Sequence, residues 1–109
     1  MSGSASLSTH VLDTHTGRPA AGLRVALSRI DAGREVSIGV RQTDGDGRVR
    51  EFATELTPGT YRLTFDVGSY FADRRGLFTS VSLEIALGAG HHHVPLLVSP
   101  FACVAYRGT

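Results

Sequence analysis

Histidines are the residues in this sequence best suited to proton transfer, and four of the five lie at two places of interest. His91, His92 and His93 stand directly before the apolar run at residues 94–98, and His10 lies in an alternating segment near the N-terminus. A histidine has an ordinary pKa of about 6.5, so it can take a proton from water near neutral pH. Side chains alternate between the two faces of a strand. This parity predicts that His10 and His93 point away from the core and that His92 lies on the core side.

Leucines share the outward faces with these histidines, because Leu12 and Leu97 have the same parity as His10 and His93. Such a mixture differs from an ordinary solvated face and indicates a surface that another subunit covers. Parity alone leaves two alternatives open. The consecutive histidines could be a solvated strand end, or His10, His91 and His93 could supply three nitrogen ligands for an open zinc site.

An arginine follows a segment rich in turn-forming residues, Thr-Asp-Gly-Asp-Gly-Arg at residues 43–48. Its Asp-Gly pairs predict a hairpin between a strand that ends near Gln42 and a strand that starts near Val49. The segment does not fit a calcium loop, because Arg48 stands where an oxygen ligand is needed. A rigid turn would hold the Arg48 guanidinium at a fixed point, where two parallel hydrogen bonds could bind a planar anion.

The end of the chain has the residue types of an ordered segment. An aromatic, a cation, a glycine and a hydroxyl occur together at residues 106–109, and we expect this segment to be ordered, with a disordered Thr109 as the alternative. Cys103, the only cysteine, is predicted to be a buried structural thiol rather than a nucleophile. A single cysteine excludes an intrachain disulfide and favours a reducing compartment.

Strands must position these residues, because alternation with period two dominates the chain. Apolar residues alternate with other residues at residues 23–27, 36–40, 61–65 and 81–87, which predicts a half-buried strand at each. Further strands are expected at residues 7–13, 91–98 and 102–107, which gives an all-β, two-sheet antiparallel sandwich of about seven or eight strands. One short helix is predicted over residues 70–75, with Ser69 as its N-cap and Gly76 as its stop.

Composition narrows the class of protein. The 109 residues are 41% hydrophobic and 19% charged, as expected for one globular domain over residues 7–109 after a flexible tail at residues 1–6. A net charge of +1 is too small to favour nucleic acid as a partner. All eleven basic residues are arginine, which excludes lysine chemistry. Because the sequence shows no secretion signal and no apolar run of about 18 residues, we expect no membrane partner and a cytoplasmic location.

Four groups of motifs occur in order along nearly the whole chain. They are Leu-Ser-Thr-His-Val-Leu-Asp-Thr at 7–14 with Gly-Arg-Pro-Ala at 17–20, Thr-Asp-Gly-Asp-Gly-Arg at 43–48, His-His-His-Val-Pro-Leu-Leu at 91–97 and Tyr-Arg-Gly-Thr at 106–109. Together they closely resemble the transthyretin-related family of 5-hydroxyisourate hydrolases. The resemblance implies an eight-stranded transthyretin-like sandwich, assembled as a homotetramer (a dimer of dimers) with active sites in the channel where two dimers meet.

The resemblance also implies a reaction and a set of site residues. The reaction is hydrolysis of 5-hydroxyisourate, a product of urate oxidation, to 2-oxo-4-hydroxy-4-carboxy-5-ureidoimidazoline, without a metal or cofactor. Matching the motifs position by position implies that His10, Arg48 and His93 are catalytic. It implies that the terminal residues Tyr106, Arg107, Gly108 and Thr109 bind substrate.

The sequence departs from the family pattern in four places. His92 replaces the tyrosine of a common His-Tyr-His, Thr109 replaces a final serine, residues 103–105 are more apolar than usual, and residues 74–80 lack a Phe-Tyr-Pro-Glu run. These differences bear on substrate range and rate more than on fold. A non-catalytic carrier, as in transthyretin itself, is a further alternative. The retained histidines and arginine argue against it, because a hydrophobic channel gains nothing from burying charged groups.

Overall fold

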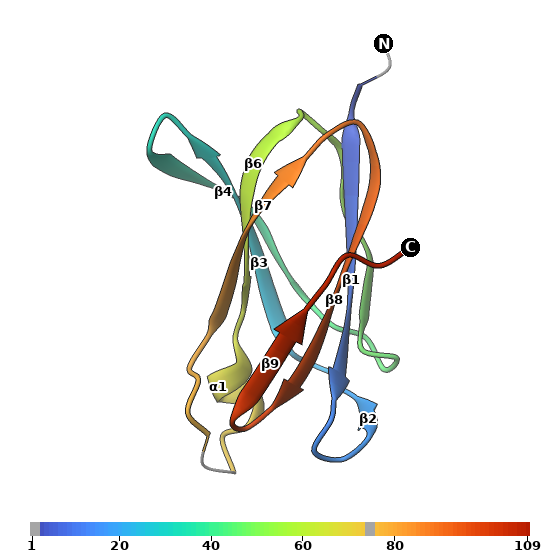
Figure 1. Ribbon diagram of the computed structural model, residues 1–109, viewed down its shortest axis with the longest axis vertical. Helices are drawn as coiled ribbons and strands as arrows, with labels where there is room; N and C mark the ends of the chain where they lie inside the picture. The colour runs from blue at the N-terminus through green and yellow to red at the C-terminus, as the bar shows by residue number, and fades with distance from the viewer. Residues whose placement is uncertain (1–2, 74–75) are drawn as a thin grey trace.

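The computed structural model describes residues 3–73 and 76–109 and shows a sandwich of two sheets (Figure 1). The strands are β1 (Ala5–Asp13), β2 (Arg18–Pro19), β3 (Arg24–Asp31), β4 (Arg34–Gln42), β5 (Arg48–Leu56), β6 (Gly59–Phe65), β7 (Val81–Leu87), β8 (Gly90–Ser99) and β9 (Ala102–Ala105), and α1 spans Val67–Tyr70. The all-β sandwich with one short helix is therefore confirmed. No helix among the described residues is long and apolar enough to cross a membrane.

Each sheet collects strands that are distant in the sequence. The β1 sheet has the order β2-β1-β8-β9, with β5 also paired to β1, and the β3 sheet has the order β4-β3-β6-β7. The pair β1 and β8 is parallel, whereas the other strand pairs in the described part of the chain are antiparallel. This parallel pair brings the segment around His10 beside the segment around His93. It is the pairing that assembles the candidate site.

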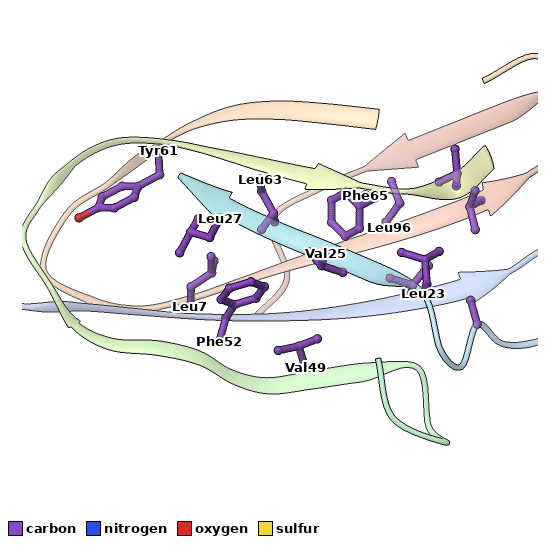
Figure 2. Packing of buried hydrophobic residues seen from close by; sticks show 14 of the residues in the cluster. Leu7, Leu23, Val25, Leu27, Val49, Phe52, Tyr61, Leu63, Phe65 and Leu96 are labelled. Carbon is purple, nitrogen blue, oxygen red and sulfur yellow. The ribbon is translucent and has the colours of Figure 1, made fainter. Parts of the chain in front are cut away.

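The core lies between the sheets and follows the predicted alternation. Figure 2 shows side chains of β1, β3, β5, β6 and β8 meeting there, among them Leu7, Val25, Phe52, Phe65 and Leu96, all of which are buried. Burial of apolar surface is the main force that holds the two sheets together, with a free-energy gain of about 25 cal/mol per Å² buried. The polar residues that alternate with this set are left on the outer faces of the sandwich.

The strand at residues 36–40 was predicted to be half-buried, and this prediction is wrong. Val36, Ile38 and Val40 are 53%, 42% and 43% exposed. They lie on β4, an edge strand whose hairpin with β3 projects from the sandwich (Figure 1). Val40 is in register with the outward Ala26, whereas Gly39 is in register with the buried Leu27. The alternation was identified correctly, but a register shift between Leu27 and Ser28 separates Val36 from Val40, and the projecting strand leaves both exposed.

The predicted helix at residues 70–75 is also wrong. Helix α1 begins earlier, and its N-cap is Asp66, whose carboxylate accepts a hydrogen bond from the Ser69 backbone N–H at 3.2 Å. Aspartate and serine are comparable N-cap residues, so the choice between them depends on where the preceding strand ends. Strand β6 ends at Phe65, which leaves Asp66 in the cap position. Residues 74 and 75 of the prediction lie outside the described residues.

Candidate functional site

The outer face of the β1 sheet brings together the residue types that the sequence singled out. His10 on β1 is in register with Arg48 on β5, and Ser8 on β1 is in register with His93 on β8. Paired residues point to the same side of a sheet. Thr9, between Ser8 and His10, is buried and points toward the core. Ser8, His10 and their register partners therefore point to the outer face of the sheet. We call Ser8, His10, Arg48 and His93 the histidine face.

The turn before β5 fixes the position of Arg48. The Asp44 carboxylate accepts hydrogen bonds from the backbone N–H groups of Asp46 and Arg48 at 2.9 and 3.0 Å. The hydrogen bond from the Arg48 backbone is the largest of the causes that lower the pKa of Asp44 below its ordinary value. The carboxylate therefore stays charged and keeps the turn closed near neutral pH.

The hairpin predicted at residues 43–48 is wrong, although the turn itself is present. Strand β4 pairs with β3 and strand β5 pairs with β1, so the turn carries the chain from one sheet to the other. Gly47 has a φ of 76°, and its carbonyl accepts a hydrogen bond from the Val11 backbone N–H at 2.7 Å. This contact docks the turn on β1 and places Arg48 beside His10 rather than beside β4.

A row of side-chain hydrogen bonds joins β1 to β8. The Ser8 hydroxyl lies 2.8 Å from Nδ1 of His93 and 2.9 Å from Nε2 of His91. The sequence interpretation did not include Ser8 in the site. Its outward parity beside His10 was the one available signal, but its contact with His93 depends on a strand register that spans 85 positions of sequence.

A depression of about 250 Å³ lies over this row. It is lined by Ser8, Thr9, Arg48, Arg50, His91, His93 and Thr109. Two arginines and two histidines therefore line this space, and the guanidinium of one of them, Arg50, is ion-paired with Asp44 and Asp46. The residues that line the depression are polar or charged, so the depression suits a polar ligand better than a hydrophobic one.

His10 belongs to the same face but does not line the depression. Its Nε2–H donates a hydrogen bond to the Asp46 carbonyl at 2.9 Å. A carbonyl oxygen can only accept, so Nε2 of His10 carries the proton and Nδ1 is the remaining basic nitrogen. His10 thus ties β1 to the turn that holds Arg48.

The C-terminal segment returns along β8 toward the histidines (Figure 1). The Gly108 backbone N–H donates to the His93 carbonyl at 2.8 Å, and the Tyr106 backbone N–H donates to the Pro95 carbonyl at 3.3 Å. Thr109 consequently reaches the depression, in agreement with the expected ordered end. The residue types at 106–109 predicted that this segment is ordered, but not that it runs along β8.

The structure separates the four terminal residues that the resemblance assigns to substrate. Thr109 lines the depression, whereas Tyr106 and Arg107 line a second groove of about 450 Å³ between β7 and the C-terminal segment. His92 lies in this second groove, on the face opposite His93, where its Nε2–H donates to the Gly88 carbonyl at 2.9 Å. Within one chain, Tyr106 and Arg107 are therefore not beside the histidine face.

Gly108 supports His93 because it has no side chain. A Cβ at this position would lie 2.6 Å from Cδ2 of His93, closer than carbon atoms approach one another. We predict that Gly108→Ala shifts the His93 ring and lowers kcat about 10- to 100-fold, since small misplacements of a reacting group have effects of this size. Turnover and the melting temperature of the purified variant measure this. Gly88→Ala, at a position with open space around it, is the control, and equal turnover in both variants would contradict the prediction.

Electrostatics favour the neutral form of His93. Desolvation is the largest cause that lowers its pKa below the ordinary 6.5, and the charges of Arg48, His10 and His91 lower it further, partly opposed by a hydrogen bond involving the Ser8 backbone. A neutral imidazole offers a lone pair. Nδ1 of His93 is bound to Ser8, and within residues 3–73 and 76–109 its Nε2 has no hydrogen-bond partner. Nε2 is therefore the nitrogen available for proton transfer.

Two other predictions from the sequence concern metals and the thiol. Among the described residues, no three His, Cys, Asp or Glu side chains are grouped so that they could hold a metal ion, which disfavours a zinc site at His10, His91 and His93. Cys103 is half-buried and packs against the core. Burial raises the pKa of its thiol, so it does not have the character of a nucleophile.

The fold and the histidine face define a transthyretin-like sandwich with a polar, imidazole-lined site on one sheet. The family model described as HIUase/Transthyretin family matches residues 7–108. A protein of Deinococcus radiodurans named 5-hydroxyisourate hydrolase is 40% identical, with 100% of each chain covered. The chain belongs to the HIUase/Transthyretin family.

Solved structures agree with this assignment. The Klebsiella pneumoniae 5-hydroxyisourate hydrolase superposes with a TM-score of 0.88 at 37% identity, covering 96% of this chain and 99% of that one. Sea bream transthyretin, solved in complex with thyroxine, superposes with a TM-score of 0.87 at 25% identity, covering 94% of each chain. The same sandwich thus occurs in an enzyme and in a protein that binds an aromatic ligand, so the function depends on the residues at the site.

Proposed function

We propose that this protein hydrolyses 5-hydroxyisourate to 2-oxo-4-hydroxy-4-carboxy-5-ureidoimidazoline in urate degradation. Relatives with this name at about 40% identity over the full chain support the proposal. The observation that carries it is the convergence of a neutral histidine and a guanidinium at one depression, where His93 and Arg48 both line the space. Ring hydrolysis needs a base for water and a cation for the developing oxyanion.

The arrangement suggests a role for each group. Nε2 of His93 takes a proton from water as the water oxygen bonds to the ring carbonyl carbon. The Arg48 guanidinium stabilises the oxyanion of the tetrahedral intermediate. The carbonyl then re-forms, the ring C–N bond breaks, and the proton held by His93 passes to the leaving nitrogen, so that His93 is returned to its neutral form. His10 completes the catalytic set by holding the turn that carries Arg48, which keeps that guanidinium in place.

Assembly would complete the site. The histidine face continues into Leu12 and Leu97, which are in register and half-buried, and Val104 on β9 is 54% exposed. An apolar margin of this kind suits contact with another subunit. We propose a homotetramer, a dimer of dimers, in which two dimers enclose the histidine face in a channel and the terminal residues Tyr106, Arg107, Gly108 and Thr109 contribute to substrate binding. A cytoplasmic location, consistent with the single cysteine, is part of the same proposal.

The function is tested by generating 5-hydroxyisourate from urate with urate oxidase and following its ultraviolet absorbance. The expected result is a faster loss of 5-hydroxyisourate when this protein is added, in proportion to its concentration. A decay rate that is the same with and without the protein would reject the proposal. Heat-denatured protein at the same concentration is the control for catalysis that does not require the folded site.

The pH dependence of catalysis follows from the state of His93. Its pKa is lowered from 6.5, chiefly by desolvation, so the basic form persists as the pH falls below that value. We predict that kcat/KM declines only below pH 6.5, with an acid limb whose midpoint lies beneath the ordinary histidine pKa. Rates measured from about pH 5 to pH 9 give this profile. A midpoint above 6.5 would show that the desolvation and cationic neighbours of His93 do not control the reaction.

A further inference from the structure

Two serines and two histidines form a continuous hydrogen-bonded row on the β1 sheet. The Ser6 hydroxyl lies 2.7 Å from Nδ1 of His91, Nε2 of His91 lies 2.9 Å from the Ser8 hydroxyl, and that hydroxyl lies 2.8 Å from Nδ1 of His93. The row starts at Ser6, passes through the exposed His91 and the buried Ser8, and ends at the half-buried His93. It uses one nitrogen of His93 and leaves the other at the depression.

The parallel register of β1 and β8 produces this row. Ser6 is in register with His91, and Ser8 is in register with His93. Because alternate residues of a strand share one face, the two Ser–His pairs lie next to each other on the same side. Ser8 is only 6% exposed, and its hydroxyl lies within hydrogen-bond distance of both imidazoles. The Ser8 hydroxyl is therefore occupied by two nitrogen partners rather than by solvent.

The number of protons on the Ser8 hydroxyl determines how hydrogen bonds are donated along the row. The Ser8 hydroxyl has one proton, so it can donate to only one of the two histidines. If it donates to His91, it accepts from His93, whose Nδ1 is then protonated and whose Nε2 carries the lone pair. If it donates to His93, the order reverses and Nε2 of His93 is protonated. Only the first direction gives His93 a basic nitrogen at the depression.

We propose that Ser8 and His91 are positioning residues that hold His93 with Nδ1 protonated and Nε2 free to act on water. His91 accepts the Ser8 proton at Nε2 and in turn donates from Nδ1 to the Ser6 hydroxyl. The Ser8 oxygen is thereby directed to accept from His93. This inference rests on the proposed hydrolase function, which selects the direction of the row, but the tautomer of His93 can be measured without substrate.

The decisive variant is Ser8→Ala, because it removes the one oxygen that both imidazoles share. We expect kcat to fall about 10- to 100-fold, as for other groups that orient a catalytic histidine. KM should change less than about twofold, because Ser8 acts through His93 and not through binding of the substrate. Ser8→Thr retains the hydroxyl and is expected to recover most of the lost turnover. If Ser8 only filled space, Ser8→Thr would not restore turnover.

The tautomer is measured directly by nitrogen NMR of protein labelled at its histidine rings. In the wild-type protein at a pH above the His93 transition, Nδ1 of His93 should show the shift of a protonated nitrogen and Nε2 that of an unprotonated one. Ser8→Ala should give a mixture of the two tautomers. His91→Ala should weaken the same tautomer preference. Its exposed position makes it the second test should Ser8→Ala fail to fold.

A matched control removes a similar hydroxyl from the other sheet. Thr64→Val deletes the hydrogen bond of 3.0 Å between Thr64 on β6 and Ser82 on β7, which leaves the histidine face untouched, and both its kcat and the His93 tautomer should equal those of the wild type. An unchanged tautomer in Ser8→Ala and His91→Ala would overturn the proposal. So would a kcat for Ser8→Ala within twofold of the wild type. An inactive wild-type protein with the expected tautomers would reject the hydrolase function alone.

Discussion

Replacing His93 with glutamine is expected to lower kcat for 5-hydroxyisourate hydrolysis by about 10²- to 10⁴-fold, the range that loss of a general base produces. Glutamine has a similar length and can still bond to Ser8, but its amide does not accept a proton from water near neutral pH. The fold should be retained, since His93 lies on the outer face of the sheet and outside the hydrophobic core. KM should change little compared with kcat.

The measurement is the rate of ultraviolet decay of enzymatically generated 5-hydroxyisourate at several substrate concentrations. His15→Gln makes the same exchange at an exposed turn outside the site and should have wild-type rates. If His93→Gln retained more than half of the wild-type kcat, another group would have to supply the base. His10 would then be the next candidate, through its Nδ1.

Arg48→Ala is expected to have the second large effect, a loss of about 10²- to 10³-fold in kcat, because it removes the donor for the oxyanion. The guanidinium of Arg48 has no hydrogen bond or ion pair with another described residue, and it lines the depression. Its removal therefore breaks no side-chain contact that stabilises the fold. The turn itself is held by the backbone N–H of residue 48, which alanine keeps.

Arg48→Lys distinguishes charge from geometry. A lysine keeps the charge but loses the planar pair of donors, so we expect only partial recovery of kcat. Arg34→Ala, at an exposed position on β4, is the matched control and should leave kcat and KM unchanged. Full turnover in Arg48→Ala would show that the oxyanion is stabilised elsewhere, with Arg50 as the neighbouring guanidinium at the same depression.

Strand parity could be predicted from the sequence because it depends on local alternation. Thr9 is buried and His10 lies on the opposite face of the same strand, as the pattern of β1 indicated. Parity failed for β4, where Val36 and Val40 lie outside because the strand is at an edge. The alternation of one strand carries no information on which of its faces the rest of the chain covers.

Features that depend on pairing between distant segments could not be predicted. The turn at residues 43–48 was identified from its Asp-Gly chemistry, but β4 and β5 belong to different sheets, which no local residue specifies. Ser8 was missed for the same reason, since its partner His93 lies on a strand reached through a parallel register. The division of the terminal residues between two hollows, with Thr109 in one and Tyr106 in the other, likewise follows from the course of the chain.

The most direct measurement compares the wild-type protein with the double variant Arg48→Ala, His93→Gln in buffer that contains a strong chelator. If Arg48 and His93 perform the hydrolysis with water alone, the chelated wild type accelerates the decay of 5-hydroxyisourate, while the double variant, folded with the same circular dichroism, leaves it at the spontaneous rate. Acceleration by the double variant equal to that of the wild type, or a wild type that the chelator silences and added metal restores, would contradict this account.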